Sequence, residues 1–414
     1  MIGRPIEALP PRVTYNMLDA RFWLDRAPAP DAPLLSAPAI AAFNARAQAA
    51  LGLPSVLDLP DALDAGHVRA ALDGYRPLPA PCFNGLGEPL DGRYWGRLSS
   101  AAPPASDHPV SVRFGLALRR ADVRAFPTRD IVTREPGAIA LDRLQETTID
   151  LGWPVAAVAS SPDGAWQFCL TPFYWGWVPG ADLVWADREH VAEYARPAKW
   201  ATITASRAWV GLAEGGAALA QMGTRLPLMG RSERGLHVLV PRRADDGALA
   251  LVEGLIPADQ HAAVEGDLPC TLATVIAQAF RLLGEPYAWG GSRAGMFGRD
   301  CSRLVRDVYA TTGVQLPRNG SQQERACRTV VTFDGTMSEA ERRSLLVERV
   351  PPGALLPMKG HIMLYLGAID GEPFAIHSTL SNGYDGVIVS DLSLGAGSSK
   401  GSLLSRLTSA VVPG

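Results

Sequence analysis

Short apolar segments separated by turn residues run from about residue 110 to about residue 258, and they constrain the fold more than any other feature. The stretch WPVAAVASSPDGAWQFCLTPFYWGWVPG is rich in strand-forming residues and has a turn at Asp163-Gly164, and a second such turn follows at Asp246-Gly247. A chain of 414 residues is also too long for one ordinary core. We therefore expect two consecutive small all-β modules, over residues 106–195 and 196–262.

The two ends of the chain have other patterns. Residues 1–105 are rich in Pro and Ala, with short helical pieces such as SAPAIAAFNARAQAALG, and are expected to form a mainly irregular and helical segment. In residues 263–414 a helix follows Thr271, a suitable N-cap, and ends at Gly284. Its apolar stripe consists of Leu272, Val275, Ile276, Phe280 and Leu283.

The rest of this last segment continues as a helix and then strands. A second helix is expected to begin near Cys301 and to end at Gly313, with Leu304 and Val308 on its apolar face. GHIMLYLGAIDGEPFAIHS predicts two strands around an Asp370-Gly371 turn. The last domain is therefore expected to be α+β, and the chain multidomain.

Composition narrows the class of protein. The net charge is -3 and there is no long basic run, which disfavours nucleic acid and anionic membranes as partners. No apolar stretch is long enough to span a membrane, and the N-terminal residues show no apolar signal region. We expect a cytoplasmic protein, or a periplasmic one or lipoprotein if a signal segment has been removed. Five scattered cysteines without a CxxC pair argue against a disulfide framework and a cysteine zinc site.

Cys301 occupies a position that suits a nucleophile. Asp300 is a good N-cap, and the unpaired N–H groups and dipole of a helix N-terminus favour a thiolate and can face a developing oxyanion. The glycines of the preceding loop are expected to let the backbone pass close to a substrate; they are Gly290, Gly291, Gly295 and Gly298. The alternative is a buried structural cysteine.

Two of the seven histidines, His361 and His377, lie in the strands predicted for the last domain. A Cys–His pair supplies a nucleophile and a base, and a third polar group can orient the base. A Cys-His-His zinc site is a second possibility, but catalytic zinc sites usually include a carboxylate or closer ligand spacing.

Five motifs then occur in a recognisable order: YAWGG, GRDCSRLVRDVYATTG, LPRNGSQQ, PGALLPMKGHIMLYLG and FAIHS. Over residues 268–414 this pattern resembles the NlpC/P60 family of cell-wall cysteine peptidases, with a papain-like α+β fold. The resemblance implies that Cys301 is the nucleophile, His361 the base and His377 the orienting residue. It also implies that Tyr287 lines the oxyanion site, and it implies no metal or organic cofactor.

The whole order of domains resembles the γ-D-glutamyl-L-diamino acid endopeptidase subgroup, in which a clip-like N-terminal segment and two bacterial SH3-like barrels precede the peptidase. The resemblance implies a murein peptide such as L-Ala-γ-D-Glu-diamino acid as substrate, with a free N-terminal L-Ala, as in cell-wall peptide recycling. Asp300 and Ser302 would bind substrate, together with Glu146 in LQETTIDLGWP and Tyr174 in FYWGWV from the first barrel.

Two departures from the family pattern and three alternatives remain at this stage. Arg303 stands where many members have Gly, and residues 331–350, VTFDGTMSEAERRSLLVERV, form a long insertion. Both are expected near the cleft. The alternatives are a wall-remodelling peptidoglycan hydrolase, a wall-binding protein anchored by its SH3-like domains, and an enzyme that transfers the acyl group from the thioester to an amine.

Overall fold

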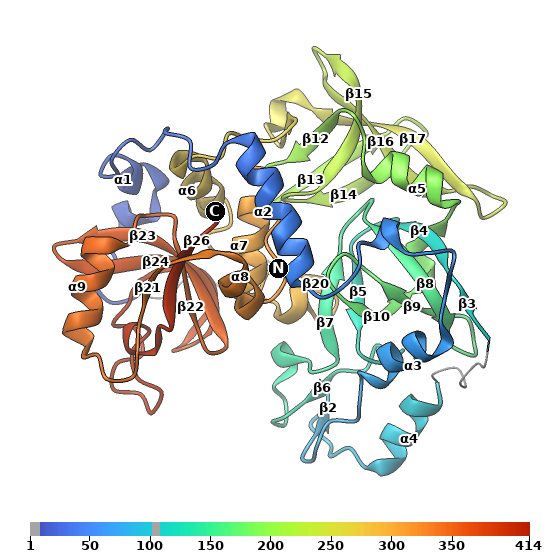
Figure 1. Cartoon of the computed structure of the whole chain (residues 1–414), viewed down its shortest axis with the longest axis horizontal. Helices are drawn as coiled ribbons and strands as arrows, with labels where there is room; N and C mark the ends of the chain where they lie inside the picture. Colours follow the sequence, from blue (N-terminus) through green and yellow to red (C-terminus); the bar gives the residue numbers. More distant parts are fainter. Residues whose placement is uncertain (1–8, 102–107) are drawn as a thin grey trace. The chain divides into compact units, whose positions relative to one another are not determined.

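A computed structural model describes residues 9–101 and 108–414, so the predicted boundary at residue 105 lies outside the described residues (Figure 1). The chain divides into two compact units, each built from separate stretches of sequence. The first unit, here called the peptidase unit, comprises residues 9–52, Asp267–Tyr287 and Gly298–Gly414. The second, here called the barrel unit, comprises Leu53–Gly266 and Ala288–Phe297.

The N-terminal helical segment is shared between these units rather than forming one of its own. Helices α1 (Ala20–Leu24) and α2 (Ala37–Ala50) belong to the peptidase unit. The side chain of Asn44 on α2 donates to the carbonyl oxygen of Gly313 at 2.9 Å and accepts from the backbone N–H of Gln315 at 2.8 Å. The prediction of one segment over residues 1–105 therefore differs from the structure, which divides it at Gly52.

The first all-β module is a seven-stranded antiparallel sheet in the order β11-β4-β8-β9-β10-β5-β7. Its strands are β4 (Arg113–Ala117), β5 (Ala121–Arg124), β7 (Gln145–Ile149), β8 (Pro154–Ser160), β9 (Trp166–Leu170), β10 (Trp175–Pro179) and β11 (Leu183–Trp185). The predicted Asp163-Gly164 turn joins β8 to β9. Helices α3 (Ala65–Asp73) and α4 (Gly92–Ser100) and two small strand pairs complete this part of the barrel unit: β1 (Ala62–Leu63) with β3 (Val110–Ser111), and β2 (Phe83–Asn84) with β6 (Val132–Thr133).

The second module is also a seven-stranded antiparallel sheet, in the order β14-β13-β17-β16-β15-β12-β18. It follows helix α5 (Arg188–Ala195), and the Asp246-Gly247 turn joins β16 to β17 as predicted. Its strands are β12 (Trp200–Ile203), β13 (Arg207–Leu212), β14 (Ala217–Gln221), β15 (Arg225–Ser232), β16 (Gly235–Arg243), β17 (Leu249–Pro257) and β18 (Ala263–Glu265).

The glycine loop after Tyr287 packs on the first all-β module. Trp289 donates its indole N–H to the carbonyl oxygen of Gln145 at 3.1 Å. Gly290 and Gly291 have φ of 61° and 87°, and a Cβ on Gly291 would lie 2.6 Å from Oγ1 of Thr148 on β7. The neighbour that these two glycines approach is β7 of the barrel unit, and their approach to a substrate stays a prediction. The loop continues as the hairpin β19 (Ser292–Arg293) and β20 (Met296–Phe297).

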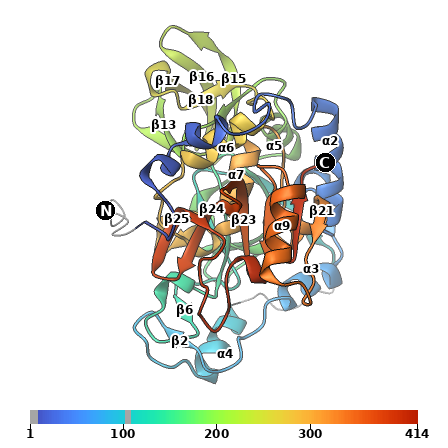
Figure 2. The same ribbon diagram turned by 90° about the vertical axis from the view of Figure 1, so that its left-hand side faces the viewer.

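The peptidase unit contains a six-stranded antiparallel sheet in the order β21-β26-β22-β23-β24-β25 (Figures 1 and 2). The strands are β21 (Arg328–Thr332), β22 (Leu355–Met358), β23 (His361–Ile369), β24 (Glu372–Ser381), β25 (Tyr384–Asp391) and β26 (Ser409–Val412). Helices α6 (Leu272–Phe280) and α7 (Cys301–Ala310) confirm the two predicted helices, and α8 (Gly320–Ala326) follows them. Thr271 caps α6 as expected, and the Asp370-Gly371 turn joins β23 to β24.

The insertion at residues 331–350 contributes to the core of this unit. It forms the end of β21 and helix α9 (Glu339–Arg349), which begins with a capping box between Ser338 and Glu341 and packs against β21 and β24 (Figure 2). Phe333 and Leu346 are buried in the same apolar cluster as Tyr365 of the sheet. The helix was not predicted, and these contacts give the insertion a role in the packing of the sheet.

Candidate active site

Cys301 is the first residue of α7, the helix that packs against β23 and β24. The carboxylate of Asp300 accepts a hydrogen bond from the backbone N–H of Arg303 at 2.8 Å, so the predicted N-cap is confirmed. All five cysteines lie among the described residues, and Cys301 alone is partly exposed. It is therefore the thiol that a substrate can reach.

The start of β23 lies next to this thiol. The backbone N–H of Ile362 donates to the sulfur of Cys301, and Ile362 directly follows His361, the first residue of β23. The helix start and the strand start are thus held together by one hydrogen bond, which brings the predicted nucleophile and the predicted base into one site.

His361, His377 and Ser390 form a hydrogen-bonded series across three adjacent strands. Nε2 of His361 lies 2.8 Å from Nδ1 of His377, and Nε2 of His377 lies 3.0 Å from Oγ of Ser390. Since Nε2 of His361 is engaged, Nδ1 is the nitrogen that can accept the thiol proton, with Nε2–H donating to His377. Ser390 was not predicted, because its role depends on the pairing of β25 with β24.

Burial shifts the pKa of each member of the pair. It raises the pKa of the Cys301 thiol to about 12, and the adjacent Asp300 carboxylate adds to the rise. Burial and then the charge of Arg406 lower the pKa of His361 to about 4, while Asp300 opposes this change. These shifts oppose ionisation of the thiol and protonation of the imidazole in the resting protein. The thiolate expected at the helix N-terminus stays a prediction.

Asp300 and Ser302 are buried in a hydrogen-bonded group with Arg318. Arg318 donates to Oδ1 of Asp300 at 3.0 Å and to Oδ2 at 2.5 Å, and it also donates to Oγ of Ser302 at 2.9 Å. Burial is the largest single influence and raises the pKa of Asp300, but the guanidinium of Arg318 and the hydrogen bonds from Arg303 and Ser302 together lower that pKa below its ordinary value. These contacts hold the start of α7 in place. The predicted binding of substrate by Asp300 and Ser302 stays a prediction.

Arg303 lies away from solvent, within a cluster of charges under α7. Its side chain is fully buried and its Nε lies 2.8 Å from Oδ1 of Asp307, one turn along the same helix. Arg299 and Arg306 contact the same carboxylate at 2.9 and 3.1 Å. The guanidinium of Arg303 is thus paired inside the fold, and the expectation that this departure from the family pattern lies near the cleft stays a prediction.

Tyr287 is held beside the nucleophile by the main chain. It is buried, and its backbone pairs in parallel with that of Arg299, two residues before Cys301. The carbonyl oxygen of Arg299 also accepts from Oγ of Ser378, the residue after His377, at 2.8 Å. The backbone at Arg299 thus connects the segments that carry Cys301 and His377 with Tyr287. The oxyanion role of Tyr287 stays a prediction.

Glu146 and Tyr174 belong to the barrel unit, on β7 and in the β9–β10 turn. Burial raises the pKa of Tyr75 well above its ordinary value, and the charges of Glu146 and Tyr174 add to this rise. The two predicted residues therefore lie near each other, with Tyr75 as a third polar neighbour. Tyr75 follows α3 in the N-terminal segment and was missed, since nothing in its local sequence connects it to the sheet.

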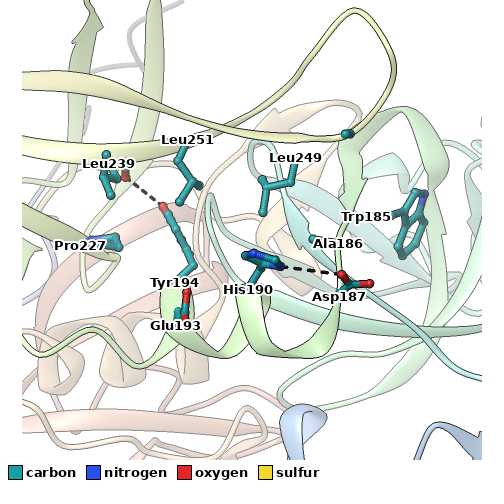
Figure 3. Close-up of a pocket in the computed structure, with 11 residues that line it drawn as sticks. Trp185, Ala186, Asp187, His190, Glu193, Tyr194, Pro227, Leu239, Leu249 and Leu251 are labelled. Atoms are coloured by element: carbon teal, nitrogen blue, oxygen red, sulfur yellow. Dashed lines mark hydrogen bonds and ion pairs between the residues drawn. The ribbon is translucent and has the colours of Figure 1, made fainter.

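A pocket of about 480 Å³ lies elsewhere in the barrel unit, between α5 and the strands β16 and β17 (Figure 3). His190 of α5 faces Leu249, and the hydroxyl of Tyr194 donates to the carbonyl oxygen of Leu239 at 3.1 Å. The predicted site residues are absent from its lining.

Residues 9–101 and 108–414 offer neither a cluster of metal ligands nor a membrane-spanning helix. No group of three or more His, Cys, Asp or Glu side chains in this part of the chain is arranged to hold a metal ion. The helices in the same ranges include none with the length and hydropathy needed to cross a membrane.

Comparisons with known proteins agree with this geometry. Residues 284–397 match the NlpC/P60 family, and residues 135–179 match the SH3 domain of SH3b1 type. The bifunctional muramidase/DL-endopeptidase CwlT of Bacillus subtilis is 38% identical over 66 residues, which cover 16% of this chain and 20% of that protein. The gamma-D-glutamyl-L-lysine dipeptidyl-peptidase of Bacillus cereus is 27% identical over 154 residues, covering 37% and 44%. The chain thus spans less than half the length of these relatives.

One solved structure resembles the whole chain. The NlpC/P60 endopeptidase from Photobacterium damselae subsp. piscicida aligns with a TM-score of 0.74 at 17% sequence identity, covering 99% of this chain and 98% of that one. At this identity the likeness concerns the fold, and it agrees with the predicted multidomain architecture. From the two family matches and the arrangement around Cys301, the chain contains an NlpC/P60 domain in its C-terminal part, preceded by an SH3-like domain.

Proposed function

We propose that this protein is a cysteine endopeptidase that hydrolyses the γ-D-glutamyl–diamino acid bond of murein peptides through a thioester on Cys301. The observation that carries the proposal is the joint placement of a partly exposed thiol and the His361–His377–Ser390 series in one unit. A nucleophile, a base and groups that orient the base are the parts that acyl transfer requires.

In the proposed reaction Nδ1 of His361 takes the thiol proton as the sulfur of Cys301 attacks the γ-carbonyl carbon. The C–N bond of the tetrahedral intermediate then breaks, and His361 gives its proton to the leaving amine of the diamino acid. Water attacks the thioester with His361 as base, which releases the γ-glutamyl acid and restores the thiol. Every proton in this sequence moves among the thiol, the imidazole, the leaving amine and water.

The proposal includes selectivity for a free N-terminal L-Ala, and with it a role in recycling peptide fragments in the cytoplasm. Support comes from the acidic and phenolic group of Glu146, Tyr174 and Tyr75 in the barrel unit, which has the chemistry to bind an ammonium group. Support for the bond comes from the name of the Bacillus cereus relative, a gamma-D-glutamyl-L-lysine dipeptidyl-peptidase.

The test compares two substrates that differ only at the N-terminus: L-Ala-γ-D-Glu-L-Lys with a free amine, and the same peptide with its L-Ala acylated by muramic acid. Mass spectrometry of the products is expected to show L-Ala-γ-D-Glu and free lysine from the first substrate, at a much higher rate than cleavage of the second. Glu146→Gln is expected to reduce this preference, because it removes the charge that faces the ammonium.

A second outcome would favour a different function. Comparable rates on intact sacculi and on the free tripeptide would contradict a recycling role, and would favour a wall-remodelling hydrolase whose SH3-like domains bind the wall. Cleavage at another bond, or transfer of the acyl group to an added amine in preference to water, would contradict the proposed reaction itself.

A further inference from the structure

Arg406 lies beside the start of β23. It ends the short 3-10 helix Leu404–Arg406, and the next residue, Leu407, forms a β-bridge with Met358. Met358 is in turn the partner of His361 in the β22–β23 hairpin. The backbone register therefore brings Arg406 close to the base of the proposed reaction.

The segment that carries Arg406 is held firmly. Leu404 and Leu407 are buried in the apolar cluster of the sheet, and the backbone N–H of Thr408 donates to the carbonyl oxygen of Pro357 at 3.0 Å. The buried guanidinium of Arg342 donates to the carbonyl oxygen of Leu407 at 2.9 Å. The backbone from which the Arg406 side chain extends is therefore fixed in position, as is required of a residue that determines specificity.

Within residues 9–101 and 108–414, the guanidinium of Arg406 has no ion-pair partner. Among the described residues its side chain makes no hydrogen bond and no salt bridge, although it is half-buried. The other guanidinium near the nucleophile, Arg318, makes a two-point contact with Asp300. An unpaired arginine next to a reacting centre, where desolvation is costly, has the chemistry to bind a carboxylate in two-point geometry.

The charge of Arg406 also acts on the base. It lowers the pKa of His361 after burial has done so, and therefore disfavours the imidazolium that must form when the thiol proton is transferred. An anion bound to the guanidinium would cancel this effect. Substrate binding would then help His361 to accept the proton at the moment when the proton is needed.

We propose that Arg406 is a specificity-determining residue that binds a free carboxylate of the substrate next to the scissile bond. The inference rests on the proposed function, because a γ-linked glutamate keeps its α-carboxylate free close to the reacting carbonyl. The diamino acid on the leaving side carries a carboxylate of the same chemistry. These are two sources of one ligand group, and substrates can be made that remove either one.

The test measures kcat/KM on three peptides: L-Ala-γ-D-Glu-L-Lys, the same peptide with the glutamyl α-carboxylate converted to a carboxamide, and the same peptide with a C-terminal lysine amide. Arg406→Gln is expected to lower kcat/KM on the first peptide by about 10- to 100-fold, the effect of losing a hydrogen bond between charged groups. On the peptide that lacks the recognised carboxylate the same variant should equal the wild type. Arg406→Lys should restore part of the loss.

Arg349→Gln is the matched control, since Arg349 is an exposed arginine at the end of α9, and it should behave as the wild type on all three peptides. A second readout is the acid limb of the kcat/KM profile, which should move to higher pH in Arg406→Gln because a positive charge near His361 is gone. Equal losses of kcat/KM on all three peptides, or no loss on any of them, would overturn the proposed role of Arg406 and leave the proposed function standing. A wild-type enzyme that cleaves none of the γ-D-glutamyl peptides would overturn the proposed function, and this inference with it.

Discussion

His361 and His377 are joined ring to ring, with 2.8 Å between Nε2 of the first and Nδ1 of the second. This contact distinguishes the proposed roles of the two histidines, which the sequence alone does not separate. His377 is fully buried, and burial together with the neighbouring His361 lowers its pKa well below the ordinary value, which favours the neutral ring expected of a partner for the proposed base.

The first prediction separates these roles by substitution. His361→Ala should lower kcat by about 10²–10⁴-fold, the usual contribution of a general base. His377→Asn should cost less, because an amide can still bond to Nε2 of His361. Steady-state kinetics on the free tripeptide checks this, and a larger loss for His377→Asn than for His361→Ala would reverse the assignment.

The second prediction concerns pH. Below its pKa the imidazole of His361 is protonated and cannot accept the thiol proton, so kcat/KM should fall as pH falls through that value. Since the pKa is lowered to about 4, the acid limb should lie near pH 4. The test is the dependence of kcat/KM on pH, measured over the range in which circular dichroism shows that the protein stays folded. An acid limb near 6.5, the ordinary histidine value, would contradict it.

The third prediction uses two glycines of the loop between Tyr287 and Asp300. Gly291 and Gly295 have φ of 87° and 81°, so alanine at either position costs roughly 1–2 kcal/mol for the left-handed backbone. A Cβ at Gly291 would also meet Thr148 at 2.6 Å, whereas nothing lies within 4 Å of one at Gly295. Gly291→Ala should therefore be less stable than Gly295→Ala by a further ~1–3 kcal/mol in denaturant unfolding. Equal stabilities would show that the packing on β7 is not tight.

The fourth prediction concerns the charges under α7. Asp307 is fully buried and contacts Arg299, Arg303 and Arg306, so Asp307→Asn removes a negative charge that three buried guanidinium groups share. The free energy of unfolding should fall by about 3–5 kcal/mol. Glu348→Gln on the exposed side of α9 is the control, expected within about 0.5 kcal/mol of the wild type. A similarly small change for Asp307→Asn would contradict the structural role of the cluster.

Local signals in the sequence were sufficient for part of the fold. The Asp300 cap and the apolar stripe after it define α7, and the Asp370-Gly371 turn between apolar segments defines the β23–β24 hairpin. Helix α9 carried such a signal too, in the Ser338–Glu341 capping box, but the segment was treated as an insertion and its helix was not predicted. The capping box is sufficient to indicate a helix start at this point in the sequence.

Other features depend on the tertiary structure and had no local signal. Ser390 reaches His377 only because β25 pairs with β24, and Tyr75 joins Glu146 across a long separation in sequence. The sequence shows that Gly290 requires an unusual backbone or a close neighbour, but it cannot show that the neighbour is Gln145. Burial likewise raises the pKa of the Cys301 thiol against the effect expected of a helix N-terminus, and burial is a property of the folded chain.

The central claim is that Cys301 is the one thiol required for turnover. The most direct measurement is the rate of release of free lysine from L-Ala-γ-D-Glu-L-Lys by Cys301→Ala, beside Cys270→Ala and Cys327→Ala, which alter buried thiols of the same unit. The account predicts no release by Cys301→Ala above the uncatalysed rate, and most of the wild-type rate in the other two variants. Release by Cys301→Ala at a rate comparable to the wild type would contradict it.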